Sequence, residues 1–313
     1  MHFKPLLLLT ACVLLSACEP KADQQVAESS PPPVTLEKTG HLESEDLLET
    51  SGLQASYADD GIFFLHNDDG KPEVFMIDAS GRDLGSISIE SAINRDWEDI
   101  TSIPVNQERW LVLGDIGDNF TQQKHVTLYF TREPRADKNG RYAGQQRLEH
   151  TLKLTYPDGP RDSESLSYDP INKQILILSK RDKPPHLYAI DLDTALSENR
   201  AQLKFLGTIS AFRKPTVADR VKWGGRVEWI SQPTGFDISP DGDQAVVITY
   251  RSLYRFRRQA GEDWLTALGR KPEEVVGPPG PQNEAIAYSE DGKSIFVVSE
   301  KLPAAVFRFQ FSD

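Results

Sequence analysis

Acidic side chains recur at one position of a pattern that this chain repeats. Glu98, Glu164 and Glu284 each stand just before a short apolar run, and Ser51 and Thr234 hold that place in two further copies. Carboxylates that a fold brings together repel one another unless a cation or a bound base lies between them. We therefore expect these residues to hold a metal ion or a charged ligand if the fold gathers them.

Oxygen ligands at such a site favour calcium over zinc. Hard carboxylate oxygens suit calcium, whereas the histidines and cysteines that zinc prefers form no cluster in this sequence. The loop Gly114–Asn119 adds oxygen ligands, and its glycines allow it to curl. The predicted calcium ligands are Glu98, Asp99, Glu164, Glu284, Asp115 and Asp118. The structural alternative is that each glutamate accepts backbone N–H groups or pairs with Arg95, Lys180 or Arg251.

The repeated pattern divides most of the chain into five similar units. Short apolar runs alternate with turn signals such as Ser80-Gly81 and Asp241-Gly242, which is typical of antiparallel strands joined by tight turns. Five four-stranded sheets around a channel form a five-bladed β-propeller, so we predict an all-β fold. The last unit lacks a fourth strand, which Val34–His41 is expected to supply as it closes the ring. A sixth blade within Ala211–Ile230 is the alternative.

In a propeller, the start of each innermost strand and the loop after each second strand lie on one face. The predicted ligand-binding residues in these loops are His66, Asn67, Lys180, Arg181, Tyr250, Arg251 and Lys301. Lysine, arginine and tyrosine beside calcium would suit a small anionic ligand such as a phosphate ester. The alternative is that these side chains only balance the acidic ring.

The longest insertion on this face, Ala211–Ser231, combines basic and aromatic residues. It carries five basic residues together with Trp223 and Trp229. We expect it to form a lid over the channel, and the alternative is an irregular loop packed at the side.

The N-terminal residues are predicted to be a secretory leader. Pro5–Leu15 is apolar but too short to span a membrane comfortably. The segment Leu15-Ser16-Ala17-Cys18 resembles the lipobox of bacterial lipoproteins, which implies a signal peptide at residues 1–17 and lipid on Cys18. Glu19, where an aspartate would resemble an inner-membrane retention signal, favours the outer membrane of a Gram-negative bacterium. We thus expect a lipid-anchored protein of the cell envelope.

Residues 18–33 are expected to be a disordered tether, because they include the run Pro31–Pro33 and few apolar side chains. A single propeller domain is predicted for residues 34–313. The net charge of -12 argues against a nucleic-acid partner, which requires a basic surface. The sequence contains no Gly-x-Ser-x-Gly motif, no His-Glu-x-x-His motif and no P-loop, and therefore indicates no particular catalytic centre.

From about Ser51 onward, the chain resembles secreted bacterial propeller proteins of the phytase-like, esterase-like and lactonase-type groups. Five segments carry the likeness: Glu164–Leu166, Glu284–Ile286, Ser239–Gly242, His66–Asp68 and Asp115–Asn119. The resemblance implies calcium near the channel, beside lysine, arginine and tyrosine in phytase-like proteins. In lactonase-type proteins asparagine is usually among the ligands, and Asn67 and Asn119 could play that part here.

These observations together predict a propeller that binds a ligand, with calcium, at one channel mouth. A calcium-dependent hydrolase of a phosphate ester or lactone is the first alternative, and a protein-interaction scaffold is the second. The expected partners are the membrane, through lipid on Cys18, and either a small anionic ligand or another envelope protein.

Overall fold

The computed structural model of this protein describes residues 1–2, 34–280 and 282–312. Apart from residues 1–2, the predicted signal peptide lies outside the described residues, as do Cys18 with its predicted lipid and the predicted tether. Among the described residues, no helix is both long enough and apolar enough to cross a membrane.

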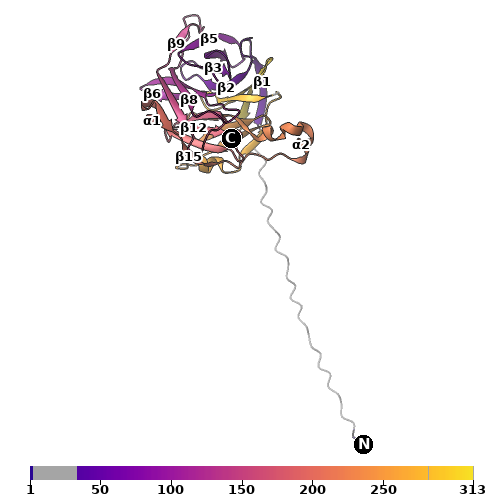
Figure 1. The fold of residues 1–313 in the computed structure, drawn as a ribbon. Coiled ribbons are helices and arrows are strands. Elements are labelled where there is room, and N and C mark those ends of the chain that lie inside the picture. The colour runs from indigo at the N-terminus through magenta and orange to yellow at the C-terminus, as the bar shows by residue number, and fades with distance from the viewer. Residues whose placement is uncertain (3–33, 281, 313) are drawn as a thin grey trace. The chain divides into compact units, whose positions relative to one another are not determined.

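Five sheets surround a central channel, which confirms the predicted five-bladed β-propeller (Figure 1). Blade one contains β2 (Thr50–Ala55), β3 (Ile62–Asn67), β4 (Glu73–Asp78) and β5 (Asp83–Glu90). Blade two contains β6 (Trp97–Val105), β7 (Glu108–Asp115), β8 (Val126–Arg132) and β10 (His150–Thr155). Blade three contains β11 (Ser163–Asp169), β12 (Gln174–Ser179), β13 (His186–Asp191) and β15 (Lys204–Thr208). Blade four contains β16 (Pro233–Ile238), β17 (Gln244–Thr249), β18 (Ser252–Arg257) and β19 (Glu273–Val276).

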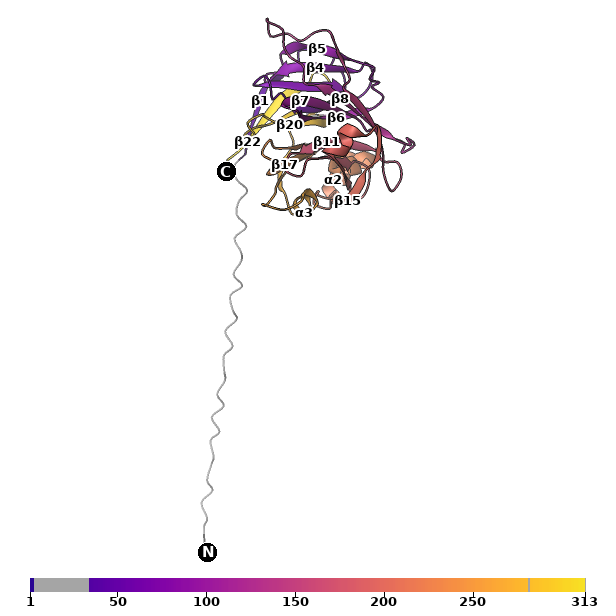
Figure 2. The ribbon, with the colours of Figure 1, turned by 90° about the vertical axis from the view of Figure 1, so that its left-hand side faces the viewer.

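Blade five closes the ring as predicted. It contains β20 (Asn283–Tyr288), β21 (Ile295–Ser299), β22 (Ala305–Phe311) and β1 (Val34–His41). Strand β1 runs antiparallel to β22, with Val34 opposite Phe311 and His41 opposite Ala305 (Figure 2). The N-terminal strand thereby covers a sheet edge that would otherwise be open to pairing with other chains.

Two short outer strands were not predicted. Strand β9 (Gln145–Arg147) lies parallel to β5, and β14 (Arg200–Gln202) lies parallel to β10. Each belongs to the outer connection of one blade and pairs with the preceding blade. They are three residues long and mostly polar, so no apolar alternation marks them in the sequence.

The alternative of a sixth blade is wrong. The insertion forms the helix α2 (Val217–Trp223) and the 3₁₀ helix η1 (Gly224–Ser231), and no strand lies between β15 and β16 in this described segment. Figure 1 shows α2 standing out from the ring of sheets. Two further short helices, α1 (Leu192–Ser197) and α3 (Trp264–Leu268), belong to the outer connections of blades three and four.

The core consists of five hydrophobic clusters, one for each interface between neighbouring blades. The innermost strands β2, β6, β11, β16 and β20 contact one another in a closed cycle around the channel. Four of them are buried at every residue, because each packs against neighbouring blades on both faces. This arrangement fixes the starts of the inner strands as neighbours at one mouth.

Two buried aspartates connect inner strands of different blades. The carboxylate of Asp99 accepts backbone N–H groups from Ile100 (2.9 Å), Leu166 (2.8 Å) and Phe236 (3.3 Å). Asp237 likewise accepts N–H groups from Ile238 and Tyr288. An inner strand has no sheet partner on its channel side, so its N–H groups need such acceptors. Asp99 was predicted to be a calcium ligand. Its carboxylate instead accepts backbone N–H groups, as the structural alternative proposed for the glutamates of this pattern.

Asp237 should make the stability of the domain depend on pH. Burial raises the pKa of Asp237 to about 7, although donors from Tyr288, Ile238 and Ser167 lower it. Because the folded state binds this proton more tightly than the unfolded chain does, the associated stability is present below pH 4 and is lost through pH 7. Replacing Asp237 with asparagine should remove about 2 kcal/mol of the decline between pH 5 and 8. Urea unfolding at pH 5 and pH 8 measures this decline in the free energy of unfolding. An equal decline in the variant and the wild type would contradict the role of Asp237.

Candidate functional site

A cavity of about 190 Å³ lies at the mouth where the inner strands begin. Its walls come from the starts of inner strands, from the loops that follow second strands, and from the insertion. The lining residues are Asp68, Asp96, Glu98, Asn119, Glu164, Lys180, Arg181, Trp229, Gln232, Tyr250, Gln282, Glu284 and Glu300. Six of these side chains carry carboxyl groups and two carry basic groups. The cavity is therefore small and acidic.

A β-bulge at the same position of all five inner strands directs the repeated residue. The pairing register of each inner strand skips one residue, and the skipped residues are Gly52, Glu98, Glu164, Thr234 and Glu284. A bulge bends its strand and re-aims a side chain. The equivalent position in blade one is Gly52, which corrects the assignment of Ser51. A Cβ atom on Gly52 would lie 2.7 Å from Nε2 of His66, so a side chain has no room there.

The strongest candidate for a metal site contains Glu98, Asp162 and Glu164. All three are buried, and each offers an oxygen atom within 4.8 Å of the others. Ligands on opposite sides of a calcium ion are about 5 Å apart, so one ion could contact all three residues. The Oε2 atom of Glu164 is buried and has no hydrogen-bond partner among the described residues. A buried carboxylate oxygen without a partner is costly, and a cation would satisfy it.

Electrostatics indicate that the carboxyl groups of this cavity exceed the positive charges that could balance them. Burial, followed by the neighbouring Glu164 carboxylate, raises the pKa of Glu98 well above its usual range. Burial also raises the pKa of Glu164 to about 8, even though Lys180 opposes the shift. Burial and the Asp162 carboxylate together raise the pKa of Asp96 to about 6. One buried ammonium is shared among several carboxylates, so a bound cation would lower the free energy of their ionised forms.

Lys180 and Tyr250 join two of the bulge glutamates. The Lys180 ammonium donates to Oε1 of Glu164 and to the hydroxyl of Tyr250, 3.1 Å away. The Tyr250 hydroxyl in turn donates to Oε1 of Glu284 at 2.7 Å. Burial alone would lower the pKa of Lys180, but the Glu164 carboxylate raises it well above its usual value, so the amine stays charged.

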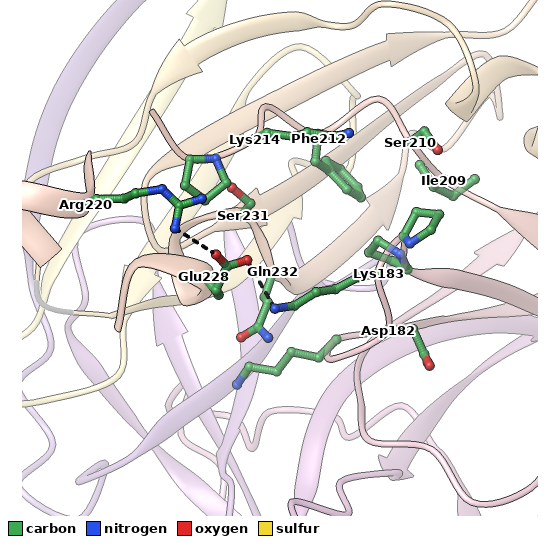
Figure 3. A pocket seen from close by; sticks show the side chains of 14 residues that line it. Asp182, Lys183, Ile209, Ser210, Phe212, Lys214, Arg220, Glu228, Ser231 and Gln232 are labelled. Atoms are coloured by element: carbon green, nitrogen blue, oxygen red, sulfur yellow. Dashed lines mark hydrogen bonds and ion pairs between the residues drawn. The ribbon is translucent and has the colours of Figure 1, made fainter. Parts of the chain in front are cut away.

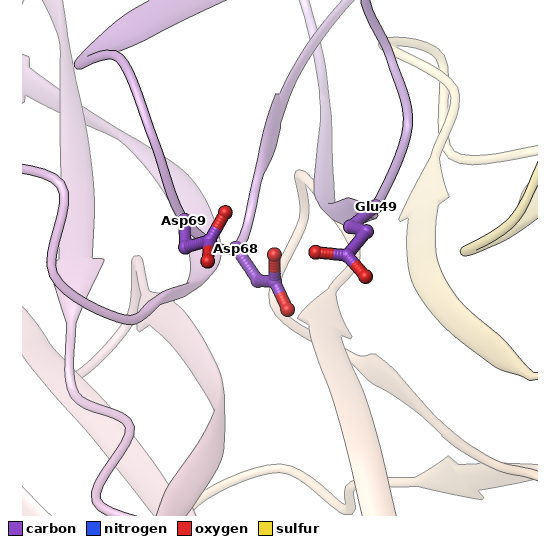
Figure 4. A group of neighbouring side chains, drawn as sticks. All are labelled: Glu49, Asp68 and Asp69. Carbon is purple, nitrogen blue, oxygen red and sulfur yellow. The ribbon is translucent and has the colours of Figure 1, made fainter.

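A second carboxylate cluster extends from the cavity toward the outside. Glu49, Asp68 and Asp69 also offer oxygens within 4.8 Å of one another, and Figure 4 shows Asp68 between the other two. Burial, followed by the Glu49 carboxylate, raises the pKa of Asp68 to about 7. Burial and the Glu284 carboxylate raise the pKa of Glu300 to about 7. This cluster is more exposed than the first, which makes it the weaker candidate for a metal.

Two predicted calcium ligands lie outside the cavity lining, one at the end of β7 and one in the loop that follows it. Asp115 accepts hydrogen bonds from Arg95 (3.0 Å) and from the backbone N–H of Asp96. Asp118 accepts backbone N–H groups from its own loop, at 3.0 Å and 2.7 Å. Gly117 has a spatial role, because a Cβ atom there would lie 2.5 Å from an oxygen of Glu98. The loop therefore packs closely against Glu98 through Gly117.

Two predicted ligand-binding residues of blade one also lie away from the cavity. His66 is fully buried, with its Nδ1 atom 3.1 Å from the carbonyl of Asn67 and its ring edge-on to Trp97. Burial lowers the pKa of His66 to about 4, so the ring is neutral. The Asn67 side chain bonds to the backbone of Glu49 and Asp46.

The predicted basic residues divide between the cavity and its surroundings. Arg181 lines the cavity and donates to Asp162 and to Asn119. Arg251 instead pairs with Asp219 of α2 at 3.1 Å and so holds the insertion against blade four. Lys301 is half exposed and lies near Glu300 (3.4 Å) and Glu49 (3.6 Å).

The insertion contributes to the cavity through its C-terminal part. Trp229 of the insertion and Gln232, which directly follows the insertion, line the cavity, and the ring of Trp229 lies 6.4 Å from that of Tyr250. Helix α2 has no buried residue and does not line the cavity. The segment is therefore a partial cover at one side of the mouth.

Several cavity residues were absent from the predicted ligands. Asp68 and Asp96 line the cavity, and Asp162 belongs to the carboxylate group of Glu98 and Glu164. All three lie within two residues of predicted ligands, so their position beside the repeated register could have identified them. No repeat signal marks Gln232, which follows the irregular insertion.

The geometry presents a small, oxygen-rich, acidic cavity at one mouth of a five-bladed β-propeller. Comparisons with known proteins add no family to this description, since no protein-family model matches the chain and no curated protein matches it at a significant level.

Proposed function

We propose that this propeller binds calcium at the mouth through Glu98, Asp162 and Glu164, and that the bound ion helps to hold a small anionic ligand. The observation that carries the proposal is the buried group of three carboxylates, in which Oε2 of Glu164 has no partner among the described residues. The donors are all carboxylate oxygens, which suits a hard cation such as calcium. Lys180, Arg181 and Tyr250 line the same cavity and could contact the anion.

Calcium titration of the chelator-treated protein tests the proposal. Isothermal calorimetry should detect one tight calcium ion per chain, and magnesium should bind more weakly because it dehydrates reluctantly. Calcium at about 100 times its Kd should stabilise the fold by about 2.7 kcal/mol, and excess chelator should reverse the effect. Absence of binding heat and of any thermal shift with about 1 mM calcium would refute the calcium site.

The same titrated protein distinguishes binding from catalysis. Assays with a chromogenic phosphate ester and a chromogenic lactone should show no calcium-dependent turnover if the protein is a binding module. Turnover that requires calcium would instead support the hydrolase alternative.

The proposal includes attachment to the outer membrane of a Gram-negative bacterium through lipid on Cys18. Its support is the lipobox-like segment Leu15-Ser16-Ala17-Cys18 and the glutamate that follows it. Several acyl chains on one residue anchor a protein firmly, whereas a single chain gives marginal binding. Labelled palmitate should enter the wild-type protein and not a Cys18→Ala variant. Equal labelling of both proteins would contradict the anchor.

A further inference from the structure

A second, larger cavity adjoins the acidic mouth. It has a volume of about 400 Å³ and lies between the loop after β12, the segment after β15 and the insertion (Figure 3). The buried side chains of Ile209 and Phe212 form part of its wall, together with Pro184, Pro185 and Pro215. This side pocket therefore offers an apolar surface that the proposed calcium site does not use.

The edge of the side pocket is basic, in contrast to the mouth. Lys183 and Arg220 both pair with Glu228, at 3.1 Å and 3.7 Å, as the dashed lines in Figure 3 show. Lys214 also lines the pocket and forms no ion pair with any described residue. Glu228 thus balances two cations, and the other carboxylate of the lining, Asp182, pairs with Arg161 at 3.4 Å. Lys214 therefore leaves the edge positive, which favours the approach of anionic molecules.

Two polar side chains lie at the junction of the cavities. Lys180 and Gln232 line both the side pocket and the mouth. Gln232 is 8% exposed, and its amide oxygen has no hydrogen-bond partner among the described residues. A buried amide without a partner is unusual in a protein interior and points to a ligand group or an ordered water. One molecule could therefore contact both cavities across this junction.

We infer that the side pocket receives the apolar body of the ligand whose anionic group lies at the mouth. The ligand class is a small organic anion, namely an aryl or short acyl chain that carries a phosphate or a carboxylate. The apolar wall would remove the body from water, while Lys180 and Gln232 would face the polar link between body and anion. The position of the anionic group rests on the proposed calcium site, whereas the apolar subsite rests on the side pocket alone.

Calorimetry with two probes tests this inference on the calcium-loaded protein. Phenyl phosphate should bind at least about tenfold more tightly than inorganic phosphate, because only the aryl ester can bury apolar surface in the side pocket. A Ser210→Trp variant should abolish this preference while it retains the wild-type affinity for inorganic phosphate and calcium. Ser210 lines the pocket and is exposed, so the added ring can occupy the pocket without disturbing the core.

An Ala218→Trp variant is the matched control. Ala218 is exposed on α2 and does not line the pocket, so tryptophan there should leave the preference for phenyl phosphate intact. If both probes bind equally, or if both variants behave alike, the apolar subsite is refuted while the calcium site stands. If calcium does not bind, phenyl phosphate binding that only Ser210→Trp blocks would still support the subsite. Absence of any such binding would refute both.

Discussion

Replacing Glu164 with glutamine is expected to weaken calcium binding by at least about 100-fold, because the number of charged ligands strongly tunes calcium affinity. The amide keeps the size of the side chain but removes its negative charge. The same substitution should leave the calcium-free protein at least as stable as the wild type. Burial already raises the pKa of Glu164 to about 8 although the Lys180 ammonium opposes the shift, so the ionised carboxylate is unfavourable unless a further cation binds. Calorimetry and urea unfolding measure the two effects.

Glu133→Gln is the control for a buried carboxylate without a binding role. Its Oε1 atom accepts hydrogen bonds from the Ser56 hydroxyl and from the N–H groups of Tyr57 and Ala58. These bonds hold the turn between β2 and β3, away from the cavity, so this variant should lose stability and keep full calcium affinity. The opposite pattern, or equal calcium affinity in the Glu164→Gln and wild-type proteins, would remove Glu164 from the site.

The second large effect is expected at an ion pair that joins blades three and four. Nη1 of Arg258 lies 3.0 Å from both carboxylate oxygens of Asp169, and the side chains are 2% and 0% exposed. The guanidinium also lies over the ring of Trp264. Arg258→Met would leave the Asp169 carboxylate buried without its cation, which costs about 3–5 kcal/mol. Urea unfolding should show this loss as a shifted midpoint with an unchanged slope.

Two further variants distinguish burial from charge. Lys293 pairs with Asp291 at 3.4 Å but is 79% exposed, so Lys293→Met should change the free energy of unfolding by less than about 1 kcal/mol. The double variant Arg258→Met with Asp169→Asn should recover part of the loss, since no uncompensated charge remains. A loss below about 1 kcal/mol in the single variant would mean that water reaches Asp169.

The sequence predicted the architecture because its signals are local and repeated. Turn dipeptides and apolar runs recur in every unit, and the unpaired run Val34–His41 matched a missing strand in the last unit. The outer strands β9 and β14 could not be predicted in the same way. Their pairing depends on contacts between neighbouring blades, which leave no apolar alternation in three mostly polar residues.

The candidate site was predictable only where it follows the repeat. Glu98, Glu164 and Glu284 share a register, and the fold turns that register into one cavity. Glu98 and Asp99 are adjacent and both acidic, yet Asp99 binds the backbone of three strands while Glu98 lines the mouth. The bulge at Glu98 determines which of the two side chains reaches the cavity. A bulge depends on how strands pair, so amino-acid composition does not reveal it.

The five bulges also separate the residues that could bind a ligand from the strand pairs that hold the fold. A bulged residue lies outside the regular ladder, so exchanging its side chain need not break a hydrogen bond between strands. Thr234 is the bulge residue that is neither acidic nor glycine, and its hydroxyl donates to the carbonyl of Asn283 in the next blade. The bulge positions at the mouth can therefore change their side chains, and with them the specificity of binding, while the fold of the five blades stays the same.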